Sequence, residues 1–329
     1  MNTSLQNSSA PAFSASVRDK WKARLYAEKP TWFLHFEEKS SLECVKNALH
    51  KFPPNSNVMK SSDIQLGAMQ QLFASYINEI WISEFPPDSN SKFSTSDVVD
   101  LLFEGKVEEM KQKMQGHVRD PDRTAKKLRS LLSASQYLFG KDLLTHAEDP
   151  LSVELIRKLH QMVGEGTLSD AGAFRAKPAG AYSSTVVYCL PPKIEARLTA
   201  LVSFANETVA ELQKTPSAPD FLKDMFLLAT LFMSEFLLIH PFSNGNGRMA
   251  RLLTNYLLRN ETIVPFSLYY QSRDVYIQVL EERSYNSGVA FPKALATYVL
   301  LCAEKTAADL LFLMMDSRTD LKERVYNRN

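Results

Sequence analysis

The fold of this 329-residue chain is decided by the stretch His240-Pro-Phe-Ser-Asn-Gly-Asn-Gly-Arg248-Met-Ala-Arg251 and by the segment before it. Met225–Ile239 is almost wholly apolar on every side, which indicates a helix through the middle of the protein. Its 15 residues fall short of the ~20 that a bilayer-spanning helix needs. Pro241 disfavours a helical conformation at His240, so we expect the helix to end there and to hold the imidazole at its mouth.

A second helical pattern begins near Asn246, which puts Gly245, Asn246 and Gly247 at a helix N-terminus. Backbone N–H groups and the positive end of the helix dipole make this position suitable for an anion, and glycines let phosphate oxygens approach the backbone. Arg248 and Arg251 are three residues apart on one face of the same helix, so both can reach the bound anion. The sequence therefore predicts a phosphate-binding site with a histidine at its edge.

The stretch resembles the signature of the Fic (Fic/DOC) family, His-Pro-Phe-x-Asp/Glu-Gly-Asn-Gly-Arg-x-x-Arg. Members of that family typically transfer AMP from ATP, with Mg²⁺ or Mn²⁺, to a Ser, Thr or Tyr hydroxyl of a protein. The resemblance implies that His240 is the general base and that Phe242 anchors the loop in the core. Arg248 would neutralise the leaving pyrophosphate and Arg251 would reach the terminal phosphate. The nucleotide-binding residues implied in this way are Asn244, Gly245, Asn246, Gly247, Arg248 and Arg251.

One position departs from the family pattern. Asn244 stands where the family has the Asp or Glu that holds the metal ion. Its amide oxygen can coordinate a hard cation but brings no charge, so metal binding is expected to weaken. Either activity depends less on tight metal binding, or the enzyme is weak, specialised or altered in its donor.

Two further segments resemble the family outside the signature. Gly172-Ala-Phe-Arg175 is similar to the family's Gly-x-Tyr/Phe-Arg turn, and the helical pattern before it contains His160, which we interpret as structural. Tyr276 lies in a segment similar to a Tyr-rich helix near the nucleoside, so it could border the adenine. A tyrosine of the hydrophobic core is the alternative.

Residues 181–190 are rich in β-branched and aromatic types and precede Pro191, which favours a short strand or hairpin. By resemblance this is the flap that holds a target segment by strand addition. We expect its edge at Thr185, Val186 and Val187; an ordinary surface hairpin is the alternative.

Many family members carry an inhibitory helix, Ser/Thr-x-x-x-Glu-Gly/Asn, whose glutamate pairs with the last arginine of the signature. Ser61 and Gln65 occupy the corresponding positions here, with Leu66 in place of Gly or Asn. Without the carboxylate, we predict weak self-inhibition or none. A simple helix cap at the serines is the alternative.

Composition narrows the function classes. A net charge of +1 gives no reason to expect a nucleic-acid or anionic-membrane partner. Three separated cysteines, Cys44, Cys189 and Cys302, indicate neither a disulfide framework nor a zinc site. The N-terminal segment lacks the apolar core of a signal peptide, so we expect a cytoplasmic protein.

We therefore predict an all-α, mostly helical Fic-like fold with a short β-hairpin flap. The expected organisation is a disordered tail (1–18), a helical N-terminal region (19–125), a Fic-like catalytic domain (126–316) and a C-terminal tail (317–329). A long apolar helix after Pro292 belongs to the core or to an interface, which leaves a homodimer open.

The predicted function is a protein adenylyltransferase that uses ATP to modify a protein hydroxyl, its own included. Alternatives are the same fold with another phosphate-containing donor, removal of AMP instead of its addition, and a nucleotide-binding regulator without turnover.

Overall fold

The computed structural model describes residues 13–27, 36–51, 72, 77, 101–115, 119–141, 150–180, 186–218, 220–262, 265–268, 275–280 and 291–315. The elements within these ranges are helical, in agreement with the predicted all-α class, and the described residues contain no extended strand. In chain order they are α1 (Phe13–Ala27), α2 (Phe36–Lys51), α6 (Val107–Met114), α7 (Pro121–Phe139), α8 (Val153–Gly164), the 3₁₀ turn η1 (Pro191–Lys193), α9 (Ile194–Leu212), α10 (Phe221–Ile239), α11 (Asn246–Leu257) and α13 (Lys293–Met315).

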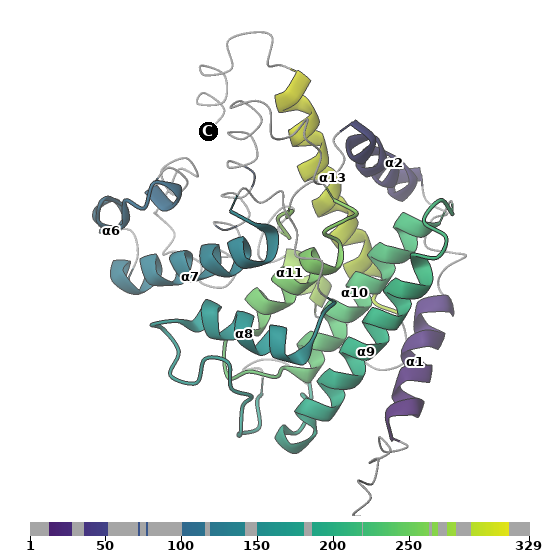
Figure 1. Cartoon of the computed structure of the whole chain (residues 1–329), viewed down its shortest axis with the longest axis horizontal. Coiled ribbons are helices and arrows are strands. Elements are labelled where there is room, and N and C mark those ends of the chain that lie inside the picture. The colour runs from purple at the N-terminus through teal and green to yellow at the C-terminus, as the bar shows by residue number, and fades with distance from the viewer. Residues whose placement is uncertain are drawn as a thin grey trace, which may run out of the picture.

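Helix α10 is the central element and packs against α9, α11 and α13 (Figure 1). Nearly all of its side chains are buried, as expected for a helix that is apolar on every side. It begins at Phe221, four residues before the predicted start at Met225, and ends at Ile239 as Pro241 requires. The additional first turn contains Lys223, which is buried and forms an ion pair with Asp220 at 2.9 Å.

A buried ion cluster joins the N-terminal helix to this core. Glu235 of α10 is 1% exposed and accepts hydrogen bonds from Arg24 of α1 at 2.5 Å and from Arg197 of α9 at 3.2 Å. A carboxylate is tolerated at such depth only when it is paired. Helix α1 begins at Phe13, so the predicted boundary between tail and helical region at residue 18 falls inside a helix.

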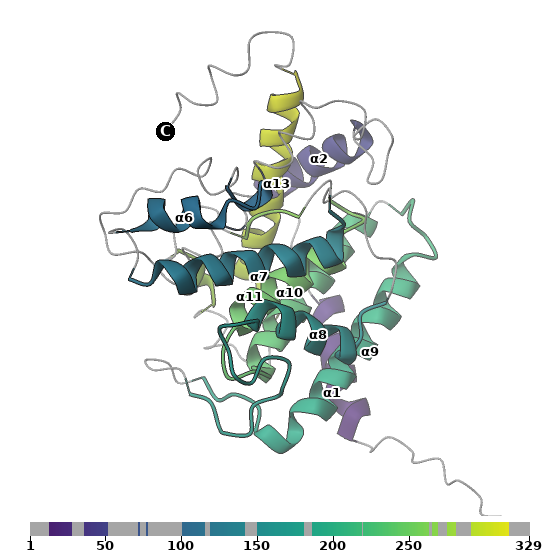
Figure 2. The same cartoon turned by 60° about the vertical axis from the view of Figure 1, so that its left-hand side comes forward.

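Helices α6, α7 and α8 form the other flank, with α7 lying along α8 and contacting α11 (Figure 2). Helix α7 starts at an N-cap, Asp120, whose side chain accepts the backbone N–H of Arg123. Ser152 caps α8 in the same way. The predicted domain boundary at residues 125 and 126 falls inside α7, so it does not separate two helices.

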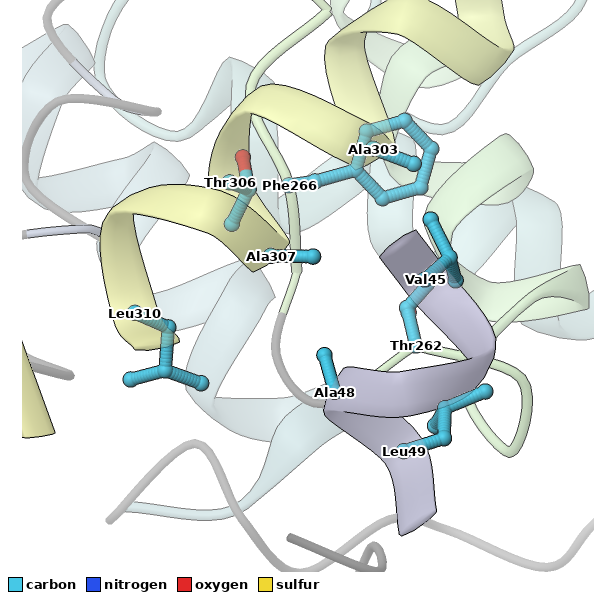
Figure 3. A pocket seen from close by; sticks show the side chains of 9 residues that line it. All are labelled: Val45, Ala48, Leu49, Thr262, Phe266, Ala303, Thr306, Ala307 and Leu310. Carbon is cyan, nitrogen blue, oxygen red and sulfur yellow. The ribbon is translucent and has the colours of Figure 1, made fainter. Parts of the chain in front are cut away.

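An apolar pocket lies between α2 and α13 (Figure 3). Its lining residues are Val45, Ala48, Leu49, Thr262, Phe266, Ala303, Thr306, Ala307 and Leu310. With no charged side chain in its wall, this pocket is unsuited to a phosphate-bearing ligand. Within the described part of the chain, no helix is long and apolar enough to cross a membrane.

Candidate active site

His240 is held at the C-terminal end of α10. Its backbone N–H donates to the carbonyl of Phe236 at 2.9 Å, and its φ of 50° lies in the left-handed region. A histidine pays roughly 1–3 kcal/mol for such a backbone and keeps it only where the surroundings fix it. The imidazole is half-buried and stacks on the ring of Tyr188, with 4.1 Å between centroids and 26° between planes. The structure therefore presents this imidazole on a rigid support, as predicted.

Arg175 supplies much of that rigidity. Its buried guanidinium donates to the carbonyls of His240 (2.6 Å), Lys177 (2.9 Å), Ile239 (3.3 Å) and Cys189. The backbone N–H of Arg175 also donates to the Pro241 carbonyl at 2.9 Å. Burial lowers the pKa of this guanidinium from its usual value. The sequence predicts the Gly-Ala-Phe-Arg turn but gives no role for its arginine. In the structure Arg175 is the clamp that joins this turn, the segment at Cys189 and the end of α10.

The loop after His240 leads directly into α11, which begins at Asn246 as predicted. Gly245 precedes the helix with a φ of 80°, and the first bond of the helix runs from the N–H of Met249 to the Gly245 carbonyl at 3.0 Å. The N–H groups of Asn246 and Gly247 lie before that bond, at the position that favours an anion.

The side chain of Asn246 has a structural task that the sequence prediction did not anticipate. Its amide oxygen accepts the N–H of Phe242 at 3.0 Å, and its amide nitrogen donates to the Phe242 carbonyl at 2.8 Å. These two bonds close the loop, so the predicted phosphate contact of Asn246 is left to its main-chain N–H. Phe242 is fully buried, in agreement with its expected role as an anchor.

Two arginines follow on the same helix and are almost completely buried. Arg248 is 2% exposed and Arg251 is 1% exposed. The guanidinium of Arg251 lies over the ring of Tyr276, 4.6 Å from its centroid, which is a cation–π geometry. Tyr276 is itself buried and contacts Tyr298. Its observed contact is therefore with the cation, and its contact with adenine stays a prediction.

His160 is predicted to be structural, and nothing in the sequence links it to the signature 80 residues away. In the structure, however, His160 contacts the signature loop directly. The imidazole is fully buried in α8, and its Nε2 lies 3.0 Å from the Asn244 carbonyl oxygen. Its ring stacks on Phe242 at 3.6 Å with planes 4° apart, and Nδ1 accepts the N–H of Gly172 at 2.8 Å. Burial is the main cause of a pKa below the usual value for His160, and nearby Arg248 lowers it further.

Asn244, the predicted metal ligand, is exposed at the loop surface. Its side-chain oxygen accepts the N–H of Gly245 at 2.6 Å. Among the described residues, no group of three or more His, Cys, Asp or Glu side chains could hold a metal ion. The donors present fit a Mg²⁺ ion that arrives on a nucleotide and takes one ligand from the protein, because Mg²⁺ commonly keeps phosphate and water ligands.

The predicted flap is described in part. Gly180 and Val187 form an isolated antiparallel bridge, and Val187 is 87% exposed. The N–H of Cys189 donates to the Leu238 carbonyl at 3.2 Å, which ties this segment to α10. Val186 is half-buried, and Thr185 lies outside the described residues.

The predicted inhibitory positions, Ser61 and Gln65, also lie outside the described residues. Their role stays a prediction.

Residues 150–258, which include α8 through α11 and every contact of His240 given above, match the family model described as Fic/DOC family. This segment is a Fic domain. Its boundaries leave α1, α2, α6, α7 and α13 outside the matched region.

Curated relatives of this Fic domain carry related names. The chain is 26% identical over 166 residues to protein adenylyltransferase Fic of Nematostella vectensis, which is 50% of this chain and 35% of the relative. It is 23% identical over 202 residues to protein adenylyltransferase fic-1 of Caenorhabditis elegans, which is 58% of this chain and 37% of the relative. A third relative, protein adenylyltransferase and cysteine protease IbpA of Histophilus somni, is 30% identical over 119 residues, or 36% of this chain and 3% of the relative. The chain thus spans little more than a third of each relative at most.

Solved structures show the same fold over a longer stretch. Fic-1 (aa134–508) from C. elegans matches 92% of this chain and 83% of its own, with a TM-score of 0.59 and 17% identity. A Fic domain containing signaling protein from Bacteroides thetaiotaomicron matches 92% and 98%, with a TM-score of 0.54 and 16% identity. The helices outside the Fic domain therefore also have counterparts in these structures.

Proposed function

We propose that this protein is an adenylyltransferase that moves AMP from ATP to a Ser, Thr or Tyr hydroxyl of a protein. The proposal rests mainly on the order of the functional groups along the short segment from His240 to Arg251. A half-buried imidazole at the end of α10 is followed within eleven residues by a helix N-terminus and two buried guanidinium groups, of Arg248 and Arg251. The names of the curated relatives support the same reaction class.

In this reaction His240 accepts the proton of the target hydroxyl. The hydroxyl oxygen then bonds to the α-phosphorus of ATP, the bond from that phosphorus to the oxygen bridging to the β-phosphate breaks, and pyrophosphate leaves. General-base catalysis of this kind contributes roughly a hundred- to ten-thousandfold in rate. A neutral imidazole near its reference pKa of ~6.5 is suited to the task at cellular pH.

The remaining groups stabilise charge. The N–H groups of Asn246 and Gly247 face the phosphates, Arg248 neutralises the leaving pyrophosphate, and Arg251 reaches the terminal phosphate. Asn244 would be the protein ligand of a Mg²⁺ ion bound to the nucleotide, and that ion would further neutralise the phosphate oxygens. The exposed segment around Val187 is the edge on which a target chain would lie.

Intact mass spectrometry tests the proposal. The purified protein, alone and mixed with a cell extract depleted of ATP, is incubated with ATP and Mg²⁺ or Mn²⁺. We expect a mass gain of one AMP on a protein, and no gain with His240→Ala. His50→Ala is a matched control, because His50 is an exposed histidine at the end of α2.

A second candidate is a nucleotide-binding regulator without turnover, and Asn244 favours it because a neutral amide is a weaker metal ligand than a carboxylate. The substitution Asn244→Asp separates the two. An adenylyltransferase should form covalent product with Asn244 in place and form more of it, in a Mg²⁺-dependent way, in Asn244→Asp. A regulator silenced by Asn244 should bind ATP without any covalent product in its wild-type form.

A further inference from the structure

His160 makes contacts that go beyond the packing of a core histidine. Both of its ring nitrogens are engaged with main chain: Nδ1 with the N–H of Gly172 at 2.8 Å and Nε2 with the carbonyl of Asn244 at 3.0 Å. Gly172 is held in turn by a second bond, because its carbonyl oxygen accepts a hydrogen bond from the side chain of Arg157 at 3.0 Å. The ring face is held by its stack on Phe242. Helix α8 thus holds the signature loop through one oriented imidazole.

These contacts determine the tautomer. The N–H of Gly172 is a donor, so Nδ1 must be the lone-pair nitrogen, and Nε2 then carries the hydrogen. That hydrogen is donated to the Asn244 carbonyl. A neutral imidazole with N–H at Nε2 satisfies both partners, and the other tautomer would leave both bonds unmade.

The bonded carbonyl belongs to the peptide unit that joins Asn244 to Gly245. In a trans peptide the C=O and the N–H point in opposite directions. With the C=O held toward His160, the Gly245 N–H points the other way, to the side of the Asn244 amide oxygen, which it reaches at 2.6 Å. That oxygen is the predicted metal ligand, so this side of the peptide is the one that a nucleotide-bound cation would approach. If the peptide flipped, a carbonyl oxygen would point to that side and repel a phosphate.

The conformation of Gly245 makes such a flip accessible, which is why it needs a restraint. Glycine populates positive φ as readily as negative φ, so its backbone has little preference of its own. Gly245 has a φ of 80°, and a Cβ at this position would lie 3.4 Å from His160 Nε2 and 3.4 Å from Arg248 Nη2. The imidazole thus lies next to this peptide, and its bond to the Asn244 carbonyl restrains a backbone that glycine alone would leave free to turn.

We propose that His160 is a positioning residue that locks the Asn244–Gly245 peptide, so that its C=O faces away from the phosphate-binding N–H groups and its N–H stays bonded to the side-chain oxygen of Asn244. The identity of the anion as ATP rests on the proposed function; the lock itself does not. His160 does not touch the reacting atoms, and it acts through the orientation of the loop.

The lock is tested first on the wild-type protein, without any variant. ¹⁵N NMR of labelled histidine at neutral pH should show His160 as a neutral ring with its hydrogen on Nε2 and with slow exchange of that hydrogen. A hydrogen on Nδ1, or a mixture of tautomers, would overturn the proposal.

Two variants then separate the lock from packing. The amide nitrogen of His160→Gln can reach the position of Nε2 and keep the donor to Asn244, whereas the shorter His160→Asn cannot. We expect His160→Asn to raise the KM for ATP by roughly tenfold, about 1.4 kcal/mol, with kcat little changed, and His160→Gln to stay within about threefold of wild type. A purely structural role would lower the melting temperature of both variants without separating them in KM, and that result refutes the lock.

Hydrogen exchange keeps the test independent of catalysis. The amide of Gly245 should exchange faster in His160→Asn than in His160→Gln, because only the former frees the peptide. If the wild-type protein transfers no AMP, the proposed function fails while this measurement still decides the lock. Equal exchange in the two variants contradicts it.

Discussion

Removal of the Arg175 guanidinium should collapse the support of His240. Arg175→Ala deletes donors to four carbonyls, those of Lys177, Cys189, Ile239 and His240, in a side chain that is only 5% exposed. The three segments that the clamp joins would lose their common partner. We therefore expect a loss of stability and, through the released imidazole, a loss of transfer.

The magnitude follows from these bonds. A hydrogen bond from a charged donor contributes about 1.5–3 kcal/mol, and the four at Arg175 are not additive because they share one group. Some of the carbonyls will be reached by water in the variant. We therefore expect the free energy of unfolding to fall by about 3–5 kcal/mol, which is in the upper tail for single substitutions. Arg175→Lys should recover less than half, because an ammonium cannot reproduce the planar fork.

Urea denaturation followed by circular dichroism measures this loss, and Arg157→Ala is the matched control. Arg157 is exposed, makes one bond to the Gly172 carbonyl and lies over the Phe174 ring, so its removal should cost less than about 1.5 kcal/mol. If Arg175→Ala destabilises the protein no more than Arg157→Ala does, the clamp is not what holds His240.

Three further predictions concern other parts of the molecule. Gly172→Ala should cost about 1–2 kcal/mol more in unfolding free energy than Gly105→Ala, because both glycines have positive φ but a new Cβ at Gly172 would lie 3.2 Å from the Arg157 carbonyl oxygen; equal costs in thermal melts would refute the crowding. Glu235→Ala should destabilise by roughly 3–5 kcal/mol because it leaves Arg24 buried without its carboxylate, and retention of wild-type stability in urea would refute a role for the cluster. Burial raises the pKa of Glu261 to about 7, so the folded state holds a proton that the unfolded state releases above a pKa near 4.5. Stability should therefore fall by roughly 2–3 kcal/mol as pH rises from about 4.5 to 7, relative to Glu261→Gln at each pH, and parallel pH curves for the two proteins would contradict this pKa.

The central helix and the start of α11 could be predicted from sequence because their signals are local. The apolar run to Ile239, the proline at 241 and the glycines before Asn246 each act on neighbouring backbone. The first turn of α10 was missed because Lys223 and Asp224 are charged, and sequence patterns do not report that both are buried.

The supports of the site could not be predicted because they are contacts between distant segments. Nothing in the residues around His160 indicates that its ring bonds a carbonyl 84 residues away. Arg175 stood in a recognised turn, yet its four acceptors come from three separate segments. A local signal did exist for Asn246, since an asparagine four residues after Phe242 at a helix start is well placed to close the loop.

We expect the site around His240 to transfer AMP and no other part of ATP. The most direct measurement compares ATP labelled at the α-phosphate with ATP labelled at the γ-phosphate, each incubated with Mg²⁺, protein and extract. Protein-bound label is expected from α-labelled ATP only, absent in His240→Ala and present in His50→Ala. Label from the γ-phosphate, or α-label that persists in His240→Ala, would contradict it.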